Sequence, residues 1–369
     1  MATFSPQTSS PTYPSPVAET DRASLMRYDA NLAVSVIVVN WNGREHLDLC
    51  LSSIQRQTLA GVEIVLVDNG STDGSIEFVR QRFGDAVRVV SNPSNFGYAA
   101  GLNAGIRAAR GRYLFALNND TELDPGCVAA LVGAADRYPN AGMCAPKILS
   151  FSERSVIDNV GHLLYPDGLS RGRGRLERDD GQYDREEEIL LPSGCAVLLR
   201  RAMLADVGLF DADLFAYCDD TDLGLRAQLA GWICRYVPTA VVYHKYSAST
   251  AHYSPLKAFL VERNRAWVAV KCLPAPLLLL SPGFTLLRLA AQGVGALSRR
   301  GAAGRFAATH SQRDLLGVLA RAVAAAVRGL PLAWQKRRII QRGRRITASD
   351  ALTWITRHGM GLREIAWKD

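Results

Sequence analysis

The segment from Tyr113 to Asp124 contains the residues best suited to chemistry. It reads YLFALNNDTELD, and its apolar run stops at Asn118, Asn119 and Asp120. An apolar run of this length is typical of a buried strand, and open α/β folds bind their ligands where such strands end. Amide and carboxylate oxygens are the donors that hard divalent cations prefer. Asp120 is therefore a candidate metal ligand, and the two asparagines are candidate ligand-binding residues.

The same arrangement occurs twice earlier in the chain. The run AVSVIVVN ends at Asn40, and GVEIVLVDNGSTDGS passes from an apolar run into Asp68 and a turn. Because parallel strands end at one edge of a sheet, these side chains and Asp120 should form one polar rim. Asp68 alone could be an ordinary turn residue, and Asn95 in SNPSNFGYAAGLNAG could either shape a loop or belong to the rim. The turn lacks the glycine spacing of a dinucleotide site or a P-loop, so neither is supported.

Two further places carry candidate functional residues. Asp219 and Asp220 lie where a helical pattern begins in YCDDTDLGLRAQLAGW, and the first turn of a helix stabilises anions. Such a pair is commonly solvated capping charge, but aromatic neighbours such as Tyr217 place it against the core. His244 follows the apolar run AVVY. A lone histidine is more often structural than a ligand, yet Asp120 by itself cannot hold a divalent ion.

Alternating strand and helix patterns from Ala33 to about Tyr138 should position these residues. Strand and helix repetition implies right-handed crossovers and a mainly parallel sheet, so the predicted fold class is α/β. The predicted strands run from Val34 to Val39, Val62 to Val67, Val87 to Val90 and Tyr113 to Leu117.

Other parts of the chain differ in composition. With 369 residues, the chain is long enough for one large domain and an appendage. Residues 1–32 are rich in Ser, Pro and Thr and should form a disordered leader, and residues 151–188 have the charged, Gly-rich composition of a mobile surface loop. The seven cysteines lack CxxC spacing, so they indicate neither a zinc site nor a disulfide framework. A reducing cytosol fits this pattern.

The C-terminal region carries most of the positive charge. Residues 256–369 hold 20 Lys and Arg against 5 Asp and Glu, a net +15, which leaves −7 for the rest of a chain whose total is +8. Between Leu273 and Leu297 the only charged residue is Arg288, and prolines such as Pro282 argue against one straight helix. We expect helices that lie in or dip into the anionic cytoplasmic leaflet of a membrane, with a true span as the alternative.

Six segments, in order along the chain, resemble the motifs of family 2 glycosyltransferases. They are SVIVVNWNG, VLVDNGSTDGS, NFGYAAGLNAG, LNNDTELDPG, the stretch from SGCAVLLRRAML to DDTDLGLRAQLAGW, and VVYHKYSAST with RNRAW. Within that family, the bacterial rhamnosyltransferase-like group, which builds cell-surface polysaccharides, is the most similar. The resemblance covers about Ser35 to Lys271. It implies a GT-A domain over residues 33–271, followed by a helical, basic, membrane-associating region over residues 272–369.

The resemblance implies roles for the rim. It implies a nucleotide-diphosphate-sugar donor, with Asp68 at the nucleotide base and Asn118 at the ribose. The triplet from Asn118 to Asp120 stands at the position of the family's DxD motif, where Asp120 would bind Mg²⁺ or Mn²⁺ under the diphosphate. Asn in place of the first Asp reduces the negative charge beside the metal. The residues expected to contact the donor are Asn40, Asp68, Asn95, Asn118 and Asn119.

The resemblance also implies roles for the acid pair and the histidine. Asp220 matches the catalytic base, Asp219 replaces the usual Glu beside it, and His244 falls where some relatives complete metal coordination. Sugar transfer with inversion needs the same parts, because a metal neutralises the charge growing on the leaving group. A carboxylate must accept the acceptor hydroxyl's proton, and a single displacement needs no enzyme nucleophile.

The expected function is inverting transfer of a sugar, with rhamnose suggested by the group resembled, to a lipid-linked or polysaccharide acceptor. The expected location is the cytoplasmic face of the membrane, with a peripheral or monotopic attachment. A sugar-1-phosphate nucleotidyltransferase is an alternative, but it should show a Gly-rich, basic loop where this chain has NWNGREH. A nucleic-acid binder using the basic tail should interleave aromatic residues with cations, and only Trp334 lies near QKRRIIQRGRR. We expect no nucleic-acid partner.

Overall fold

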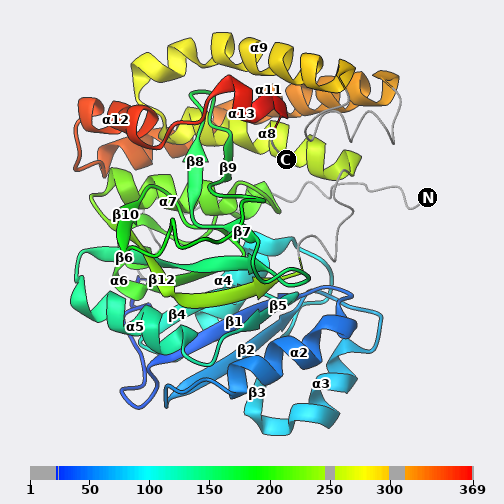
Figure 1. Ribbon diagram of the computed structural model, residues 1–369, viewed down its shortest axis with the longest axis vertical. Helices are drawn as coiled ribbons and strands as arrows, with labels where there is room; N and C mark the ends of the chain where they lie inside the picture. The colour runs from blue at the N-terminus through cyan, green and yellow to red at the C-terminus, as the bar shows by residue number, and fades with distance from the viewer. Residues whose placement is uncertain (1–21, 24, 246–253, 299–311, 368–369) are drawn as a thin grey trace.

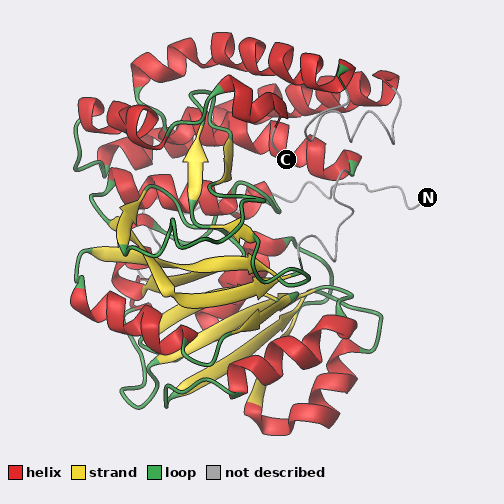
Figure 2. Cartoon of the chain, viewed as in Figure 1, coloured by secondary structure: helices red, strands yellow, loops and turns green. Residues whose placement is uncertain are grey.

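Parallel strands separated by helices build the first part of the structure (Figures 1 and 2). The computed structural model describes residues 22–23, 25–245, 254–298 and 312–367, so the expected leader lies mostly outside the described residues. The elements are β1 Val34–Asn40, α2 Arg44–Gln55, β2 Val62–Asp68, α3 Ser75–Phe83, η1 Gly84–Ala86, β3 Val87–Ser91, α4 Tyr98–Ala108 and β4 Tyr113–Asn118. The four predicted strands are confirmed, and each one extends a single residue further, onto its polar end.

The second part of the fold adds strands that run in both directions. Its elements are β5 Thr121–Leu123, α5 Cys127–Arg137, β6 Ala141–Ser150, β7 Ile157–Asn159, β8 His162–Leu164, β9 Ser170–Gly172, β10 Glu187–Ile189, β11 Ala196–Arg200, α6 Arg201–Val207, η2 Ala212–Leu214, α7 Asp219–Leu229 and β12 Ile233–His244. The main sheet has the order β10-β12-β6-β11-β4-β1-β2-β3. Strands β4, β1, β2 and β3 pair in parallel, whereas β11 runs antiparallel to both β4 and β6.

Helices cover both faces of this sheet, and each face has its own apolar core. On one face α2, α3 and α5 pack through side chains such as Leu47, Leu51 and Leu131. On the other face α4, α6 and α7 pack through Leu102, Leu204 and others. Because alternate residues of a strand point to opposite faces, β1 supplies one core with Val36 and Val38 and the other with Ile37 and Val39. The predicted α/β class with a parallel core is confirmed.

The segment 151–188 is built into the fold, so its interpretation as a mobile surface loop was wrong. It forms β7, β8, β9 and the start of β10, and Val160 and Leu164 within it are fully buried. Its charged residues find partners far away in the sequence. Asp167 is fully buried and its carboxylate pairs with Arg288 and Arg265. The composition of the segment shows that it is charged but not that the charges are paired, and for this reason the sequence predicted a solvated loop.

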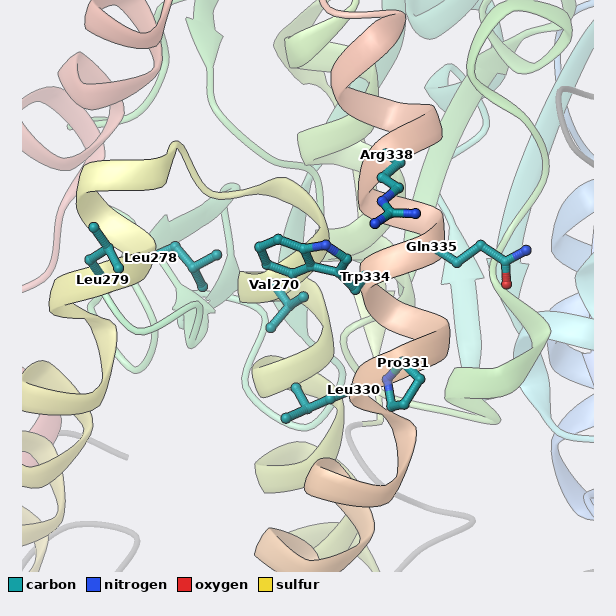
Figure 3. Close-up of a pocket in the computed structure, with 8 residues that line it drawn as sticks. All are labelled: Val270, Leu278, Leu279, Leu330, Pro331, Trp334, Gln335 and Arg338. Carbon is teal, nitrogen blue, oxygen red and sulfur yellow. The ribbon is translucent and has the colours of Figure 1, made fainter.

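The C-terminal helices form a separate layer over α7 and the β8–β9 hairpin (Figure 1). They are α8 Pro255–Cys272, α9 Ala275–Leu297, α11 Gln312–Arg342, α12 Ala348–His358 and α13 Leu362–Trp367. Two stretches, Ala275–Gly295 and Arg313–Arg342, are long and apolar enough to cross a membrane. Pro282 lies inside α9, and the helix continues beyond it to Leu297. An open apolar groove of about 620 Å³ lies between α8, α9 and α11, with Trp334 at its centre (Figure 3).

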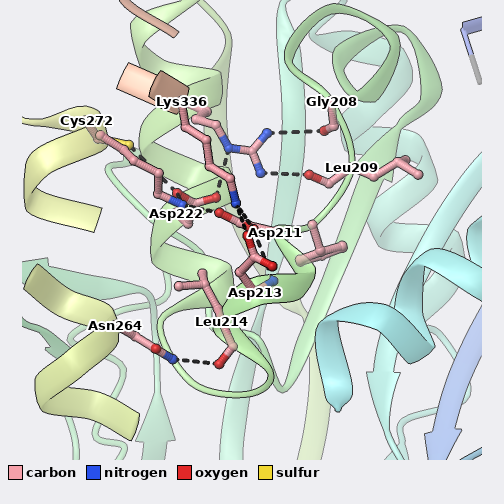
Figure 4. A network of polar contacts seen from close by, with 12 residues as sticks. Gly208, Leu209, Asp211, Asp213, Leu214, Asp222, Asn264, Cys272 and Lys336 are labelled. Atoms are coloured by element: carbon pink, nitrogen blue, oxygen red, sulfur yellow. Dashed lines mark hydrogen bonds and ion pairs between the residues drawn. The ribbon is translucent and has the colours of Figure 1, made fainter. Parts of the chain in front are cut away.

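Buried ion pairs attach this layer to the sheet domain (Figure 4). The Lys271 ammonium of α8 lies 2.6 Å from carboxylate oxygens of both Asp211 and Asp222, and Lys336 of α11 lies 2.6 Å from Asp211 and Asp213. Burial alone would raise the pKa of Asp211, but the two ammonium groups hold it well below its usual range. Removing one member would leave an uncompensated buried charge. The network therefore fixes the position of α8 and α11 relative to the sheet domain.

Candidate active site

The polar ends of three strands meet at one edge of the sheet, as their spacing predicts. Parallel pairing places Asn40 directly beside Asp68, and Val39 beside Asn118. The Asn40 side-chain amide donates to Asp68 Oδ1 at 3.2 Å and its Oδ1 accepts from Asn119 Nδ2 at 2.8 Å. Gly43 lies against this cluster, because a Cβ there would come within 2.3 Å of Asn119 Nδ2. Asn118 stays half-buried at the end of β4.

Asp68 and Asn95 also shape their own turns. The second oxygen of Asp68 accepts a hydrogen bond from the Ser71 N–H at 2.9 Å, three residues further along the turn. Asn95 Oδ1 accepts from the Gly97 N–H at 2.9 Å. Gly97 has φ +90°, and a Cβ there would lie 2.5 Å from the Phe215 carbonyl. Both residues thus hold the backbone at the rim, whichever contact they make with a ligand.

His244 and Asp120 approach each other across an antiparallel strand pair. β5 pairs with β12 so that His244 lies opposite Thr121, the residue after Asp120. His244 Nε2 is 3.4 Å from Asp120 Oδ1, and His244 Nδ1 is 2.6 Å from Asp158 Oδ2. The three side chains are buried. The Asp158 carboxylate on Nδ1 holds the ring so that Nε2 faces Asp120, and metal-binding histidines commonly have a carboxylate on their other ring nitrogen.

These donors fit a divalent cation that is bound together with a diphosphate. Asp120 offers a carboxylate oxygen and His244 a ring nitrogen, while Asn118 lies in the same turn. Among the described residues, no group of three or more His, Cys, Asp and Glu side chains forms a closed metal site. Mg²⁺ usually takes one or two carboxylates and completes its shell with water and substrate phosphates, so two protein ligands at an open edge suit this kind of site.

The acid pair occupies the first turn of α7, where its two carboxyl groups have different surroundings. Asp220 accepts hydrogen bonds from the N–H groups of Gly194 at 2.8 Å and Thr221 at 2.6 Å, and Nδ1 of His162 lies 3.5 Å from its Oδ2. Asp219 is only 4% exposed. Its burial, followed by the charge of Asp220, raises the pKa of Asp219 to about 8. Asp219 is therefore mostly protonated at neutral pH, which leaves Asp220 as the candidate proton acceptor.

Two consecutive residues connect the triplet on β4 to this acid pair. The Gly194 N–H donates to Asp220, while the Cys195 carbonyl accepts from the Asn118 N–H at 2.9 Å. The Tyr98 hydroxyl donates to the Gly194 carbonyl at 3.1 Å. Burial, followed by the charges of nearby carboxylates, raises the pKa of Tyr98 well above its usual value, so this hydroxyl keeps its proton. These contacts connect the strand end that precedes the candidate metal ligand Asp120 to the turn that carries the candidate base Asp220.

Comparison with known proteins agrees with this geometry. The family model described as "Glycosyl transferase family 2" matches residues 35–208. The chain is 31% identical over 264 residues to the N-acetylglucosaminyl-diphospho-decaprenol L-rhamnosyltransferase of Mycobacterium tuberculosis. This alignment covers 63% of this chain and 85% of the relative. The chain belongs to glycosyltransferase family 2. The alternative of a sugar-1-phosphate nucleotidyltransferase is not favoured.

Further matches of this glycosyltransferase agree in family and fold. It is 25% identical over 201 residues to an uncharacterized glycosyltransferase of Rickettsia prowazekii, covering 52% of this chain and 58% of that protein. Its fold matches the crystal structure of GalNAc-T7 with UDP, GalNAc and Mn²⁺ with a TM-score of 0.54, at 19% identity over 66% of this chain and 49% of the other. The predicted GT-A fold is confirmed.

Sequence reasoning missed three residues of the glycosyltransferase site. Tyr98 stands inside the NFGYAAGLNAG motif, so its place in a motif was a signal that could have been followed. Asp158 and His162 lie in the polar segment, where nothing in the sequence distinguishes them from solvated neighbours. In the structure Asp158 contacts His244, and His162 contacts Asp220. Both candidate functions, metal binding and proton transfer, thus receive a side chain from residues 151–188.

Proposed function

We infer that this glycosyltransferase moves a sugar of the rhamnose type from a nucleoside-diphosphate donor to a glycan carried on a lipid diphosphate. The observation that carries this proposal is the short Gly194–Cys195 connection, which holds Asp220 at one end and Asn118 at the other. A donor diphosphate bound at the rim and an acceptor hydroxyl near Asp220 would then share one site. The name of the Mycobacterium tuberculosis relative, an N-acetylglucosaminyl-diphospho-decaprenol L-rhamnosyltransferase, supports the sugar and the acceptor class.

The rim residues would bind and orient the donor. Asp120 and His244 would hold Mg²⁺ or Mn²⁺, which when bound neutralises negative charge on the departing diphosphate. Asp158 would keep the His244 ring turned toward the metal, and its own second oxygen is held by Arg175 at 2.5 Å. Asn40 and Asp68 would contact the nucleoside and Asn118 its ribose, with Asn119 beside them. The GalNAc-T7 structure, which has the same fold, contains UDP and Mn²⁺, and this supports a nucleotide donor and a divalent ion for the present enzyme.

Asp220 would act as the general base. Its Oδ2 is fixed by the Gly194 N–H, so the carboxylate is held in one orientation before the acceptor arrives. A carboxylate so placed takes the proton of the attacking hydroxyl, and the displacement inverts the anomeric carbon. Asp219 would stay neutral behind it. Asn95 would keep the loop before α4 in shape through the Gly97 N–H.

The test of this proposal is sugar transfer from nucleotide-sugar donors to a synthetic N-acetylglucosaminyl-diphospho-polyprenol, with and without Mn²⁺. We expect transfer from a rhamnose donor, and a fall of roughly 10²-fold or more in kcat for Asp220→Asn with donor affinity little changed. Transfer that proceeds equally to a free sugar would overturn the lipid-linked acceptor. An Asp220→Asn variant with the wild-type rate would overturn the assignment of the base.

The outer surface of α9 supports attachment to a membrane. Leu279 and Leu286 are 81% and 69% exposed, whereas Arg288, the single charge of this helix, is fully buried. Arg288 points inward and pairs with Asp167 at 2.7 Å and Glu262 at 2.8 Å. The helix therefore turns an uncharged, leucine-rich face outward. Its inner face is fixed to the protein, which favours a helix lying along the membrane surface over one that spans it.

Helix α11 has the composition of an interfacial helix as well. Leu316, Val323 and Val327 are exposed, and Arg321 and Arg328 are exposed among them. Apolar groups enter the boundary of the acyl chains, while each well-placed cation adds about 1 kcal/mol on an anionic surface. In this proposal residues 33–271 carry catalysis and residues 272–369 hold the enzyme at the cytoplasmic face, close to a lipid-linked acceptor.

Flotation with vesicles that contain phosphatidylglycerol tests the attachment. Leu286→Glu should reduce vesicle binding, because it places a charge on the outward face of α9. The control is Leu176→Glu, which changes an exposed leucine (55%, against 69% for Leu286) on the sheet domain and should bind like wild type. High salt should weaken but not abolish binding. Complete release by salt alone would reduce the attachment to an electrostatic contact.

A further inference from the structure

The loop that leads into the acid pair has an unusual backbone. Phe215, Tyr217 and Cys218 all have positive φ, at 65°, 67° and 61°. Residues with a Cβ seldom adopt a positive φ, because the Cβ then crowds the backbone. Three of them within four positions will persist only if the surroundings hold the loop. Asp219 and Asp220 follow directly, so the shape of this loop decides where the candidate base lies.

One buried side chain collects the carbonyls of this loop. The amide nitrogen of Asn264 lies 2.8 Å from the Leu214 carbonyl oxygen and 2.9 Å from those of Ala216 and Tyr217 (Figure 4 shows the first contact). An amide has two N–H hydrogens, so the three carbonyls share them. Asn264 is fully buried.

The remaining carbonyls of the loop are also bound. The Phe215 carbonyl accepts from the Ala99 N–H of α4 at 3.2 Å, and the Cys218 carbonyl accepts from the Asp222 N–H of α7 at 2.9 Å. Backbone groups of a buried segment have to be satisfied somewhere, and here Asn264 takes three of the five carbonyls of residues 214–218. Without it, the Ala216 and Tyr217 carbonyls would lose this hydrogen bond, while the Leu214 carbonyl would keep those from the Ala216 N–H and the Arg263 guanidinium.

Helix α8 holds Asn264 firmly in place. The neighbouring Arg263 guanidinium donates to the Leu214 carbonyl at 3.1 Å and stacks on the ring of Trp267 with its centre 4.5 Å away. Near the end of the same helix, Lys271 is fixed by its ion pairs to Asp211 and Asp222. A side chain on a helix fixed at several points can hold a strained loop to a narrow range of positions.

We propose that Asn264 is a positioning residue of the transfer reaction, which sets the location of the Asp220 carboxylate by holding the left-handed loop that precedes it. The inference rests on the proposed role of Asp220 as the base. It gives the RNRAW segment a function that the resemblance did not supply. We expect its main effect on the base side of the site, because none of the Asn264 contacts involves Asn40, Asp68 or Asp120.

A double-mutant cycle tests the proposal. Asn264→Ala should lower kcat roughly 10²-fold, the loss expected when a reacting group is displaced by about 1 Å, while the affinity for nucleoside diphosphate (UDP, GDP and dTDP, each with Mn²⁺) stays unchanged. In an Asp220→Asn background the same change should have little further effect, because there is no base left to position. Asn264→Ser keeps one donor and should fall between alanine and wild type.

The matched control is Gln228→Ala. Gln228 also is a buried amide that binds backbone carbonyls, with Nε2 2.9 Å from the Leu190 oxygen, but it lies near the far end of α7. Its loss should lower thermal stability without changing kcat. An Asn264→Ala rate within twofold of wild type, or an undiminished loss in the Asp220→Asn background, would overturn the proposal. If Asn264→Ala does not fold, Asn264→Ser decides by the same cycle. A normal rate for Asp220→Asn alone would instead refute the base assignment.

Discussion

Replacing Asp219 with Asn should make the folded protein more stable than wild type, and the difference in unfolding free energy should grow as the pH rises. The pKa of Asp219 is raised from 3.8 to about 8, first by burial and then by the charge of Asp220. An acid with a raised pKa in the folded state favours folding below its unfolded value and loses that contribution as pH rises toward the folded value. Each pKa unit is worth about 1.4 kcal/mol. At pH 7 the pH lies roughly three units above the unfolded-state pKa. The loss of unfolding free energy in the wild type is therefore at most about 4 kcal/mol. Asn has the same shape and no charge to bury, so it avoids the loss.

Urea denaturation of wild type and Asp219→Asn at pH 5, 6, 7 and 8 measures this effect. The difference in unfolding free energy between the two proteins should widen with each step in favour of the variant, and then level off above pH 8. Comparing the proteins at the same pH cancels the other titrating groups. A difference that stays constant, or that narrows with rising pH, would show that Asp219 is ionised in the fold. The variant should also keep kcat within about tenfold of wild type, in contrast to Asp220→Asn.

Three further outcomes test the metal and base sides of the site. Asp120→Ala should abolish transfer and remove Mn²⁺-dependent nucleotide binding while circular dichroism stays unchanged; full activity in excess EDTA would contradict the metal's role. Asp158→Asn should weaken Mn²⁺ binding 10- to 100-fold in a titration followed by electron paramagnetic resonance, and an unchanged affinity would show that Asp158 does not orient His244. His162→Asn, whose amide nitrogen can replace Nδ1, should keep most of kcat, whereas His162→Leu should lose about tenfold; equal rates would exclude a contribution from that nitrogen.

The rim of the site could be predicted from the sequence because it follows from local patterns. An apolar run that ends in Asn40 or Asp68 predicts both the strand and its polar end. Parallel pairing then places the two polar ends side by side at one edge of the sheet. Asp158 and Asp167 could not be found in this way. Their partners His244 and Arg288 lie 86 and 121 residues further along the chain, and a charged, Gly-rich composition describes a buried hairpin and a solvated loop equally well.

The C-terminal region shows the same limit. The sequence identifies Arg288 as the one charge in an apolar run, but it cannot say whether that charge faces lipid, water or protein. Only the position of Asp167 and Glu262 decides that it points inward. The left-handed loop before Asp219 could not be predicted from the sequence either, because Phe215, Tyr217 and Cys218 are not residue types that commonly have a positive φ.

All seven cysteines of the chain are buried as free thiols, and this makes them a set of chemical reporters. Burial raises the pKa of the Cys50 and Cys272 thiols to about 12, and the other five are raised as well. Alkylating reagents attack thiolates, so the folded protein should be almost inert to iodoacetamide. Each thiol that does react then records an opening of its own surroundings. Cys218 would report on the loop before the acid pair and Cys272 on the junction of α8 with α9, and peptide mass spectrometry would follow both in a single sample.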